Sequence, residues 1–229
     1  MRLLALFAHP DDEVGCLGTL AKHVARGDQV LLSWTTMGEL ASQFGRASAD
    51  EVTKTRTAHG AFVAEKIGAS YRFFDFGDSR VTGSRDQVLA VAKLYAEFQP
   101  DTVITWDDYS GHPDHRATAK LAFDAVTFAR IPKIVSEGEA EPKAAHRKPV
   151  RIYQYHHRAS PFPSVHIDIS EQIGTVTEVF AFYRDFYGWK ATDEQFQAQR
   201  AMIGREVGCR FAEHFQLRST SLPAQTYLP

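Results

Sequence analysis

Two short stretches of the sequence combine histidine with aspartate, the side chains that hold metal ions and move protons. The first reads HPDDE, from His9 to Glu13, and the second reads HPDH, from His112 to His115. Neutral imidazole and carboxylate are zinc ligands, and a catalytic zinc typically takes three protein groups and leaves a fourth position for water. His9 and Asp12 from the first cluster and one histidine from the second would supply such a set.

Each cluster follows a short apolar run that is typical of a buried strand. RLLALFA precedes the first cluster, TVITW precedes the second, and helix-patterned segments alternate with further strands of this type. This alternation indicates βα units wound into a mostly parallel sheet. Ligand sites in such sheets lie beyond the carboxyl ends of the strands, so the two clusters are expected to meet at one edge.

The pattern predicts a single α/β domain over residues 1–229, with a mostly parallel sheet flanked by helices. Strands are expected at 2–8, 29–36, 70–76, 102–106, 150–156 and 164–169. Helices are expected at 13–26, 50–67, 86–98, 115–130, 170–189 and 192–209. The Pro-, Lys- and Glu-rich segment from Pro132 to Pro149 is expected to be a solvated loop excursion.

Composition narrows the class of protein and its partners. The chain has 229 residues, is 44% hydrophobic and carries a formal net charge of −2, which suits one globular domain. Because Lys and Arg are not clustered, no nucleic-acid partner is expected. No apolar run approaches the roughly 20 residues of a membrane helix, so no membrane partner is expected either.

The cysteines and the first residues favour a cytoplasmic location. Cys16 and Cys209 are the only two cysteines, and neither lies in a CxxC pair, which favours a reducing compartment. The apolar stretch from Leu3 to Ala8 is too short for a signal peptide. A homo-oligomer is compatible with this composition.

The two clusters together resemble the signature of a known family. AHPDDE at Ala8–Glu13 with GHPDH at Gly111–His115 is similar to the LmbE-like (PIG-L) family of zinc-dependent N-deacetylases. The likeness extends through PDTVITWDD and GREVGCRFAEHF. It implies a Rossmann-like sheet, one zinc ion as cofactor, and hydrolysis of an acetamido group on a sugar or a related small amide. The implied partner is therefore a small N-acylated, sugar-type molecule.

The resemblance also implies which residues bind the metal and which one acts as base. It gives His9, Asp12 and His115 as the metal ligands. Asp11 matches the base that takes a proton from the attacking water. Glu13 is expected to be a helix cap or a supporting group with no catalytic role.

Four further residues acquire roles through the same resemblance. His112 would stabilise the tetrahedral oxyanion and protonate the leaving amine, with Asp114 as the partner that keeps it cationic. Arg56 and Asp78 correspond to positions that hold substrate hydroxyls.

This chain departs from the family pattern at several places. The family often has a Tyr two residues before the first histidine of GHPDH; here that place is Ser110, and Tyr109 stands one residue earlier. His59 stands where a Glu is common, three residues after Arg56. The helix after DIS reads TVTEVFAFYRDFYGW and is rich in aromatic residues. We therefore expect substrate specificity to lie in this helix and in the 132–149 excursion.

Other functions fit the two clusters less well. Acids and proline at a helix start are common without any catalytic role, but two such clusters would then follow two strands by coincidence. A dinucleotide-binding module needs a Gly-rich first turn, and a magnesium-dependent phosphotransferase needs oxygen ligands in place of histidine. An amidase acting on a non-sugar amide and a metal-binding module without catalysis are the remaining alternatives.

Overall fold

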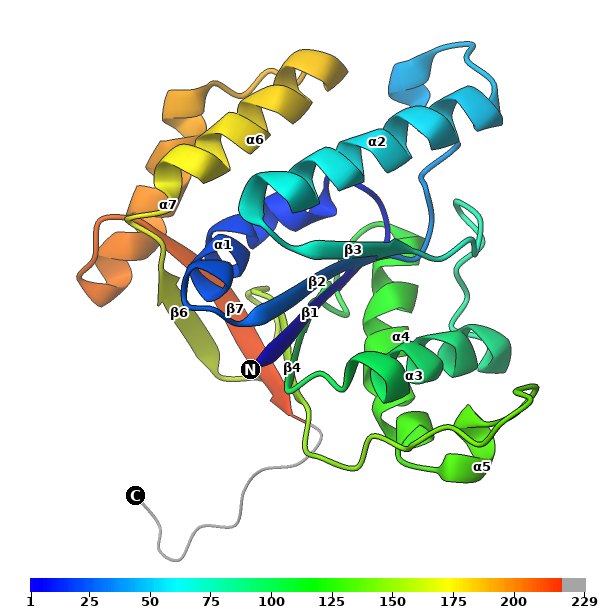
Figure 1. The fold of residues 1–229 in the computed structure, drawn as a ribbon. Coiled ribbons are helices and arrows are strands. Elements are labelled where there is room, and N and C mark those ends of the chain that lie inside the picture. The colour runs from blue at the N-terminus through cyan, green and yellow to red at the C-terminus, as the bar shows by residue number, and fades with distance from the viewer. Residues whose placement is uncertain (220–229) are drawn as a thin grey trace, which may run out of the picture.

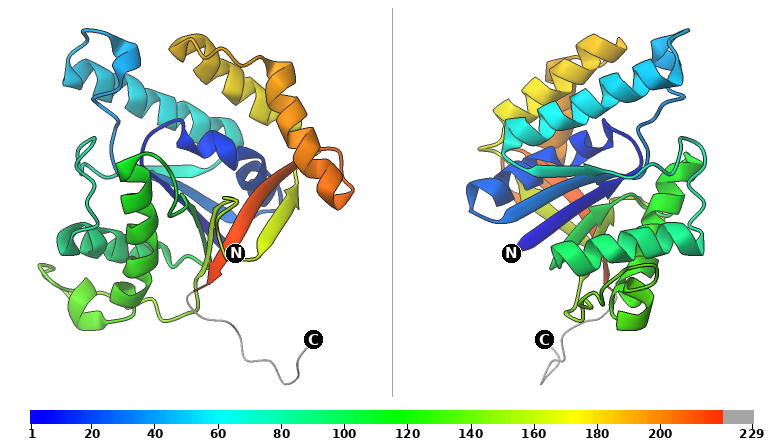
Figure 2. Two further views of the ribbon diagram at one scale, coloured as in Figure 1. Left: turned by 180° about the vertical axis from the view of Figure 1, so that it is seen from behind. Right: turned by 45° about the vertical axis from the view of Figure 1, so that its right-hand side comes forward.

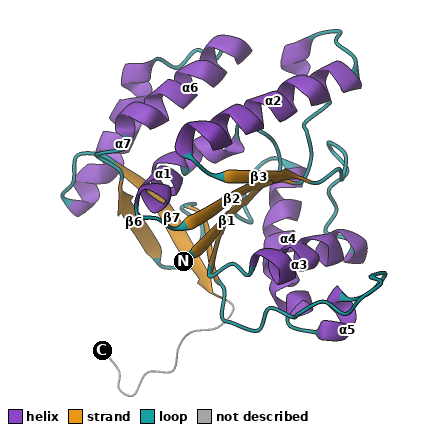
Figure 3. Cartoon of the chain, in the orientation of Figure 1, coloured by secondary structure: helices purple, strands orange, loops and turns teal. Residues whose placement is uncertain are grey.

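The computed structural model describes residues 1–219, which fold into one sheet with helices on both of its faces (Figures 1 and 3). The strands are β1 (Arg2–Phe7), β2 (Gln29–Trp34), β3 (Ser70–Phe73), β4 (Thr102–Thr105), β5 (Arg151–Tyr155), β6 (Ser164–Asp168) and β7 (Ala212–Ser219). The α-helices are α1 (Leu17–Ala25), α2 (Ala49–Ile67), α3 (Arg85–Phe98), α4 (Pro113–Ala129), α5 (Pro132–Val135), α6 (Ile173–Tyr187) and α7 (Asp193–Val207). Two 3-10 turns are η1 (Asp12–Gly15) and η2 (Ser42–Phe44).

The sheet is mostly parallel, as the alternation of strands and helices predicts. Its strand order is β3-β2-β1-β4-β5-β7-β6, and the first five strands in this order pair in parallel. Only β7 runs antiparallel to both of its neighbours. Figure 2 shows two helical layers, with α1, α2, α6 and α7 on one face of the sheet and α3, α4 and α5 on the other. The predicted α/β fold is confirmed.

The core forms on both faces of the sheet, and β1, which lies inside the sheet between β2 and β4, contributes to both. Leu3, Ala5 and Phe7 pack among the residues of one helical layer, and Leu4 and Leu6 pack among those of the other. All five side chains are fully buried, which explains the continuous apolar run in this strand. Within the part of the chain that the structure describes, no helix is long and apolar enough to cross a membrane.

The helix expected at 13–26 is interrupted. The chain forms η1 first, and α1 begins at Leu17. The buried Glu213 carboxylate on β7 accepts hydrogen bonds from the backbone N–H groups of Gly18 and Thr19, both at 2.8 Å. A carboxylate at this position satisfies free N–H groups and opposes the positive end of the helix dipole. The AE pair of the C-terminal motif therefore anchors the start of α1.

The excursion from Pro132 to Pro149 differs from the solvated loop that its composition predicts. It begins with α5 and buries Val135 and His146. The His146 ring contacts Gln99 at 2.9 Å and the carbonyl oxygen of Pro100 at 2.8 Å. These partners precede β4, so this part of the segment lies at the edge opposite the two His-Asp clusters. None of its residues lines the two cavities described below, and the expected role in substrate selection stays a prediction.

Candidate metal and catalytic centre

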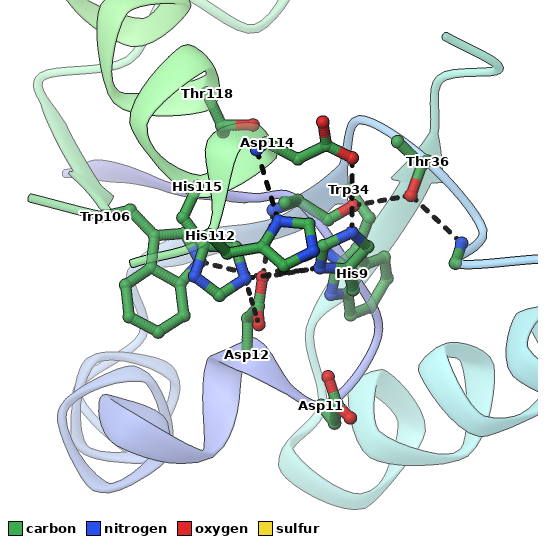
Figure 4. Close-up of polar contacts among 12 residues, drawn as sticks. His9, Asp11, Asp12, Trp34, Thr36, Trp106, His112, Asp114, His115 and Thr118 are labelled. Atoms are coloured by element: carbon green, nitrogen blue, oxygen red, sulfur yellow. Dashed lines mark hydrogen bonds and ion pairs between the residues drawn. The ribbon is translucent and has the colours of Figure 1, made fainter. Parts of the chain in front are cut away.

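The two His-Asp clusters meet at the point where the strand order reverses. The first cluster follows β1 and the second follows the neighbouring strand β4, and α1 and α4 leave on opposite faces of the sheet. Loops beyond such a reversal form the usual ligand crevice of open α/β sheets. Figure 4 shows His9 and Asp12 from the first cluster facing His112 and His115 at the start of α4.

Three ligand-type side chains converge at this point. His9 Nδ1 lies 3.3 Å from His115 Nε2, and His115 Nε2 lies 3.4 Å from Asp12 Oδ1. The other Asp12 oxygen, Oδ2, lies 3.8 Å from His9 Nδ1. A tetrahedral zinc with bonds of about 2.0–2.2 Å separates its ligand atoms by about 3.3–3.5 Å. The spacing of these atoms therefore fits a tetrahedral ion.

Hydrogen bonds fix the orientation of the Asp12 carboxylate. Its Oδ2 accepts from the backbone N–H groups of Ala8 at 3.1 Å and His9 at 2.9 Å, and from Trp106 Nε1 at 2.8 Å. Since three donors occupy Oδ2, Oδ1 is left to face His115. The Trp106 ring also stacks on the His115 ring, with centroids 3.9 Å apart and planes within 8°. Sequence reasoning gave Trp106 no role, although it holds both of these side chains in place.

Ser110 occupies the place where the family often has a Tyr. Its hydroxyl lies 2.9 Å from His115 Nδ1, so the other ring nitrogen, Nε2, is directed toward Asp12 and His9. A hydrogen bond to the outer nitrogen is the usual way in which a metal-binding histidine is oriented. Tyr109 is exposed and stacks on His157 with centroids 4.8 Å apart, outside the cavities described below. It therefore does not take the place of the missing Tyr.

His9 is surrounded by negative charge. Its Nε2 lies 3.4 Å from Asp78 Oδ1 and 3.5 Å from Asp114 Oδ2, and it is buried without a well-aligned hydrogen bond. Burial alone would lower its pKa, but the contacts with Asp114 and Asp78 and the charge of Asp12 raise the pKa of His9 to about 10. A centre with this excess of carboxylates favours a positive charge, and a metal cation would supply it.

The pKa of His115, in contrast to that of His9, is lowered. Burial, together with the positive charge of His9, lowers the pKa of His115 to about 4, although the charge of Asp12 opposes this shift. The ring is therefore neutral at pH 7, as metal binding through a ring nitrogen requires.

The Asp114 side chain does not contact His112 as the sequence predicts. It is buried, and its Oδ2 accepts a 2.7 Å hydrogen bond from the backbone N–H of Ser79 and faces His9. The backbone N–H of Asp114, in contrast, donates to His112 Nδ1 at 3.2 Å, because His112 is the N-cap of α4. With Nδ1 as an acceptor, the neutral His112 ring carries its proton on Nε2. The predicted partnership of the two side chains is wrong.

Asp11 lies beside the three ligand-type residues in a strained conformation. Its φ of 121° is a backbone conformation that residues with a side chain rarely adopt. The fully buried Glu13 stabilises it, because Glu13 Oε2 accepts from the Asp11 N–H at 3.0 Å. Glu13 is held in turn by Trp34 Nε1 at 3.1 Å and by the Tyr183 hydroxyl at 2.7 Å. Strain of this kind concentrates at functional sites.

The buried Arg56 on α2 faces Asp11. Its Nη2 donates to Asp11 Oδ1 at 3.2 Å and to the carbonyl oxygen of Pro10, and its guanidinium lies 5.4 Å from the centre of the Tyr187 ring. Burial raises the pKa of Asp11 to about 7, while the charge of Arg56 opposes this shift. The predicted residue Arg56 thus reaches the centre as the ion-pair partner of Asp11.

The departure at His59 is accommodated by the aromatic helix α6. His59 Nδ1 lies 3.1 Å from the Tyr187 hydroxyl, and its ring packs edge-on against the rings of Phe182, Tyr183 and Phe186. Burial and the charge of Arg56 lower the pKa of His59 to about 4. His59 and the aromatic helix α6, two departures from the family pattern that lie far apart in sequence, therefore pack against each other.

Two cavities open on either side of the centre and share Asp11, Asp12 and His115. The first has a volume of about 460 Å³ and is lined mainly by polar residues, namely His9, Gly38, Leu40, Ala41, Ser42, Gln43, Arg56, Asp78, Ser79 and His112. The second has a volume of about 450 Å³; besides the shared residues it is lined by the aromatic side chains of Trp106, Tyr155 and Trp189 and by Gly15, Asp107 and His156. The predicted substrate residues Arg56 and Asp78 both line the first cavity.

Several relatives similar in sequence are named as deacetylases. The chain is 24% identical over 220 residues to a diacetylchitobiose deacetylase of Thermococcus kodakarensis. This alignment covers 93% of this chain and 81% of that protein. It is 30% identical over 159 residues to a 1D-myo-inositol 2-acetamido-2-deoxy-alpha-D-glucopyranoside deacetylase of Salinispora arenicola, covering 57% of this chain and 52% of that protein. The chain thus spans about half the length of this second relative.

Solved structures share the fold over nearly the whole chain. An N,N'-diacetylchitobiose deacetylase from Pyrococcus horikoshii superposes with a TM-score of 0.80 at 23% identity, covering 95% of this chain and 83% of that one. GalB, the 4-carboxy-2-hydroxymuconate hydratase of Pseudomonas putida, superposes with a TM-score of 0.75 at 21% identity. The superposition covers 100% of this chain and 99% of that one. The fold alone therefore does not determine the reaction.

A family model described as PIG-L, GlcNAc-PI de-N-acetylase, matches residues 4–126, a stretch that contains both His-Asp clusters. This match covers more than half of the chain, and the protein belongs to the PIG-L family.

Proposed function

We propose that this protein is a zinc-dependent hydrolase that removes an N-acetyl or other N-acyl group from an amino sugar or a sugar-containing small molecule. The observation that carries the proposal is the convergence of His9 Nδ1, His115 Nε2 and Asp12 at 3.3–3.8 Å beside the strained Asp11. Membership of the PIG-L family and the names of the deacetylase relatives support the choice of reaction.

His9, Asp12 and His115 would hold the zinc ion. Support for this set comes from the spacing of their atoms and from the groups behind them, since Asp114 and Asp78 face the outer nitrogen of His9 and Ser110 contacts that of His115. Zinc in such a site supplies a Lewis acid that polarises an amide carbonyl and lowers the pKa of water toward about 7.

Asp11 would act as the general base. Its carboxylate lines both cavities next to the proposed ligands, so it is in reach of a water molecule that attacks the amide carbon. Its pKa of about 7 is close to the value at which a base combines proton affinity with a useful ionised fraction at neutral pH. Arg56, 3.2 Å away, favours the ionised form and fixes the direction of the carboxylate.

His112 would act on the oxygen and the nitrogen of the scissile amide. Because its Nδ1 accepts the Asp114 N–H, the proton on Nε2 is available for donation. That N–H would stabilise the negative charge that develops on the carbonyl oxygen. To protonate the leaving nitrogen, His112 would act as the imidazolium, with Nδ1 released from the Asp114 N–H and carrying the second proton, which the water gives up through Asp11. Loss of one such donor typically lowers turnover by about 100- to 1,000-fold.

The first cavity would bind the sugar. Arg56 and Asp78 line it and remain the proposed contacts to substrate hydroxyls. Burial opposes ionisation of Asp78, but its contact with His9 and the hydrogen bond from Leu40 N–H hold its pKa at about 2, so it is an acceptor at neutral pH.

A substrate panel tests the proposal. The zinc-loaded protein is expected to release free amine from N-acetylglucosamine, from N,N'-diacetylchitobiose or from an inositol-linked N-acetylglucosamine, and chelation is expected to stop the release. A simple N-alkyl acetamide, measured alongside, distinguishes an amino-sugar deacetylase from a general amidase. Release from the simple amide alone would support the non-sugar amidase, and release from none of these substrates would contradict N-deacetylation.

A further inference from the structure

We propose that the second cavity is a binding site for the acyl chain of the substrate, so that the preferred substrates carry N-acyl groups longer than acetyl. This inference rests on the proposed N-acyl hydrolase function and specifies its substrate class. It follows from three features of the second cavity: its walls, its position relative to His112, and its size.

Three aromatic side chains, Trp106, Tyr155 and Trp189, form the apolar part of the second cavity beside Asp107 and His156, and two of them contact the proposed metal ligands. The Trp106 ring stacks on His115 and lies edge-on to Tyr155 with centroids 4.9 Å apart. The Tyr155 hydroxyl donates to the carbonyl oxygen of Asp12 at 2.7 Å. A Cβ at Gly15 would lie 2.7 Å from the Tyr155 ring, so glycine allows this ring to pack at the base of the cavity. An apolar surface therefore begins directly beside the proposed ligands.

Trp189 forms the outer wall and is held rigidly. Gly188, with a φ of 69°, ends α6, and the Trp189 N–H donates back to the carbonyl oxygen of Arg184 at 3.0 Å. The ring then packs against the rings of Tyr183 and Tyr187, with centroids 6.1 Å and 5.8 Å away. A wall that is fixed before binding loses little conformational entropy when a ligand contacts it.

The position of His112 sets the direction of the substrate. His112 lines the first cavity and does not line the second. The group that protonates the leaving nitrogen must lie beside that nitrogen, so the amine and its sugar occupy the first cavity. The acyl group, on the other side of the scissile bond, then points into the second cavity. The mainly polar first cavity thus faces the hydroxyl groups, and Trp106, Tyr155 and Trp189 in the second face the acyl chain.

The size of the second cavity exceeds the need of an acetyl group. Its volume of about 450 Å³ is in the range of whole small-ligand pockets, whereas acetyl brings a single methyl group. Each methylene that becomes buried stabilises the bound state by about 0.8 kcal/mol, which corresponds to about a fourfold change in kcat/KM. Partial burial at this open cavity reduces this gain to about twofold per methylene.

A chain-length series provides the test. The rates of amine release from N-acetyl-, N-butanoyl- and N-hexanoylglucosamine are measured with the zinc-loaded wild type. We expect kcat/KM for the hexanoyl compound to exceed that for the acetyl compound by about 10-fold or more. Equal values, or a preference for acetyl, would overturn the inference while leaving the deacetylase function intact.

Two variants locate the effect. Trp189→Ala is expected to lower the hexanoyl-to-acetyl ratio of kcat/KM by about 5- to 10-fold, and Trp189→Phe to lower it less. Tyr71→Ala is the matched control, because Tyr71 is an exposed aromatic residue on β3 that lines neither cavity. An unchanged hexanoyl-to-acetyl ratio in Trp189→Ala would show that the acyl chain does not bind in this cavity. A loss of affinity for a disaccharide without a change in this ratio would show the same.

Binding measurements separate this inference from the proposed reaction. The dissociation constants of the same three compounds are measured on the zinc-loaded Asp11→Asn variant by isothermal titration calorimetry. Affinity that rises with chain length supports the acyl site even if the wild type releases no amine. Affinity that is independent of chain length overturns it even if the wild type is an active deacetylase.

Discussion

Asp114 Oδ2 lies 3.5 Å from His9 Nε2, and the Asp114 carboxylate is directed away from His112. Asp114 thus contacts the outer ring nitrogen of one proposed metal ligand, His9, and Ser110 contacts the outer ring nitrogen of the other, His115. Such outer contacts fix the ring orientation and the tautomer of a ligand histidine. The Asp78 carboxylate, at 3.4 Å from the same nitrogen, shares this position.

We predict that Asp114→Asn and Ser110→Ala each weaken zinc affinity by about 10- to 100-fold, because each removes the group that orients a ligand ring. Competition with a chelator of known affinity measures the effect. Asp124→Asn is the control for Asp114→Asn, since Asp124 is a partly exposed aspartate on the same helix and pairs with Lys120, away from the proposed ligands. Unchanged zinc affinity in both variants would show that these contacts do not support a metal site.

We predict that Asp11→Asn keeps the fold and the zinc but lowers turnover by about 100- to 10,000-fold, because an amide cannot accept the proton of a water molecule at neutral pH. Amine release and zinc content are measured on the same preparation. Near-normal turnover with full zinc content would exclude Asp11 as the general base.

We predict that His59 makes the fold less stable as the pH falls. Its pKa is about 4 in the folded protein, against an ordinary value of about 6.5, so between these values only the unfolded chain binds the proton. The stability contributed by neutral His59 is therefore present above pH 6.5 and is lost as the pH falls toward 4, by about 2 kcal/mol at pH 5.

Urea unfolding at pH 7 and pH 5 measures this contribution. The decrease in the free energy of unfolding between the two values is expected to be about 2 kcal/mol smaller in His59→Gln than in the wild type. An equal decrease in both proteins would show that another group accounts for the acid sensitivity.

Much of the parallel half of the fold could be predicted from the sequence, because β1, β2 and β4 are buried apolar runs and α2 and α3 have clear start signals in Ser48 and Ser84. β7 was missed. Its residues were read only as part of a motif after α7, and the strand is defined by pairing with β5 and β6, which come much earlier in the chain. The function of Glu213 as the anchor of α1 likewise depends on a contact across 195 residues.

The composition of the candidate site was predictable, but the direction of its side chains was not. The helix expected to begin at His115 begins at Pro113, with His112 as its N-cap. This shift of two residues places Asp114 in the first turn and turns its carboxylate toward His9. The aromatic helix α6, in which substrate specificity is expected, buries Phe180 and Tyr183 in the core, and the position of Trp189 depends on the turn at Gly188 that ends the helix.

The zinc content of His115→Ala and His112→Ala, compared side by side, tests the central claim most directly. The two histidines lie in one motif, and both are close to His9, but only His115 is proposed to bind the metal. We predict that His115→Ala loses the zinc, whereas His112→Ala retains one zinc per chain. Full zinc in His115→Ala together with loss of zinc in His112→Ala would contradict the account.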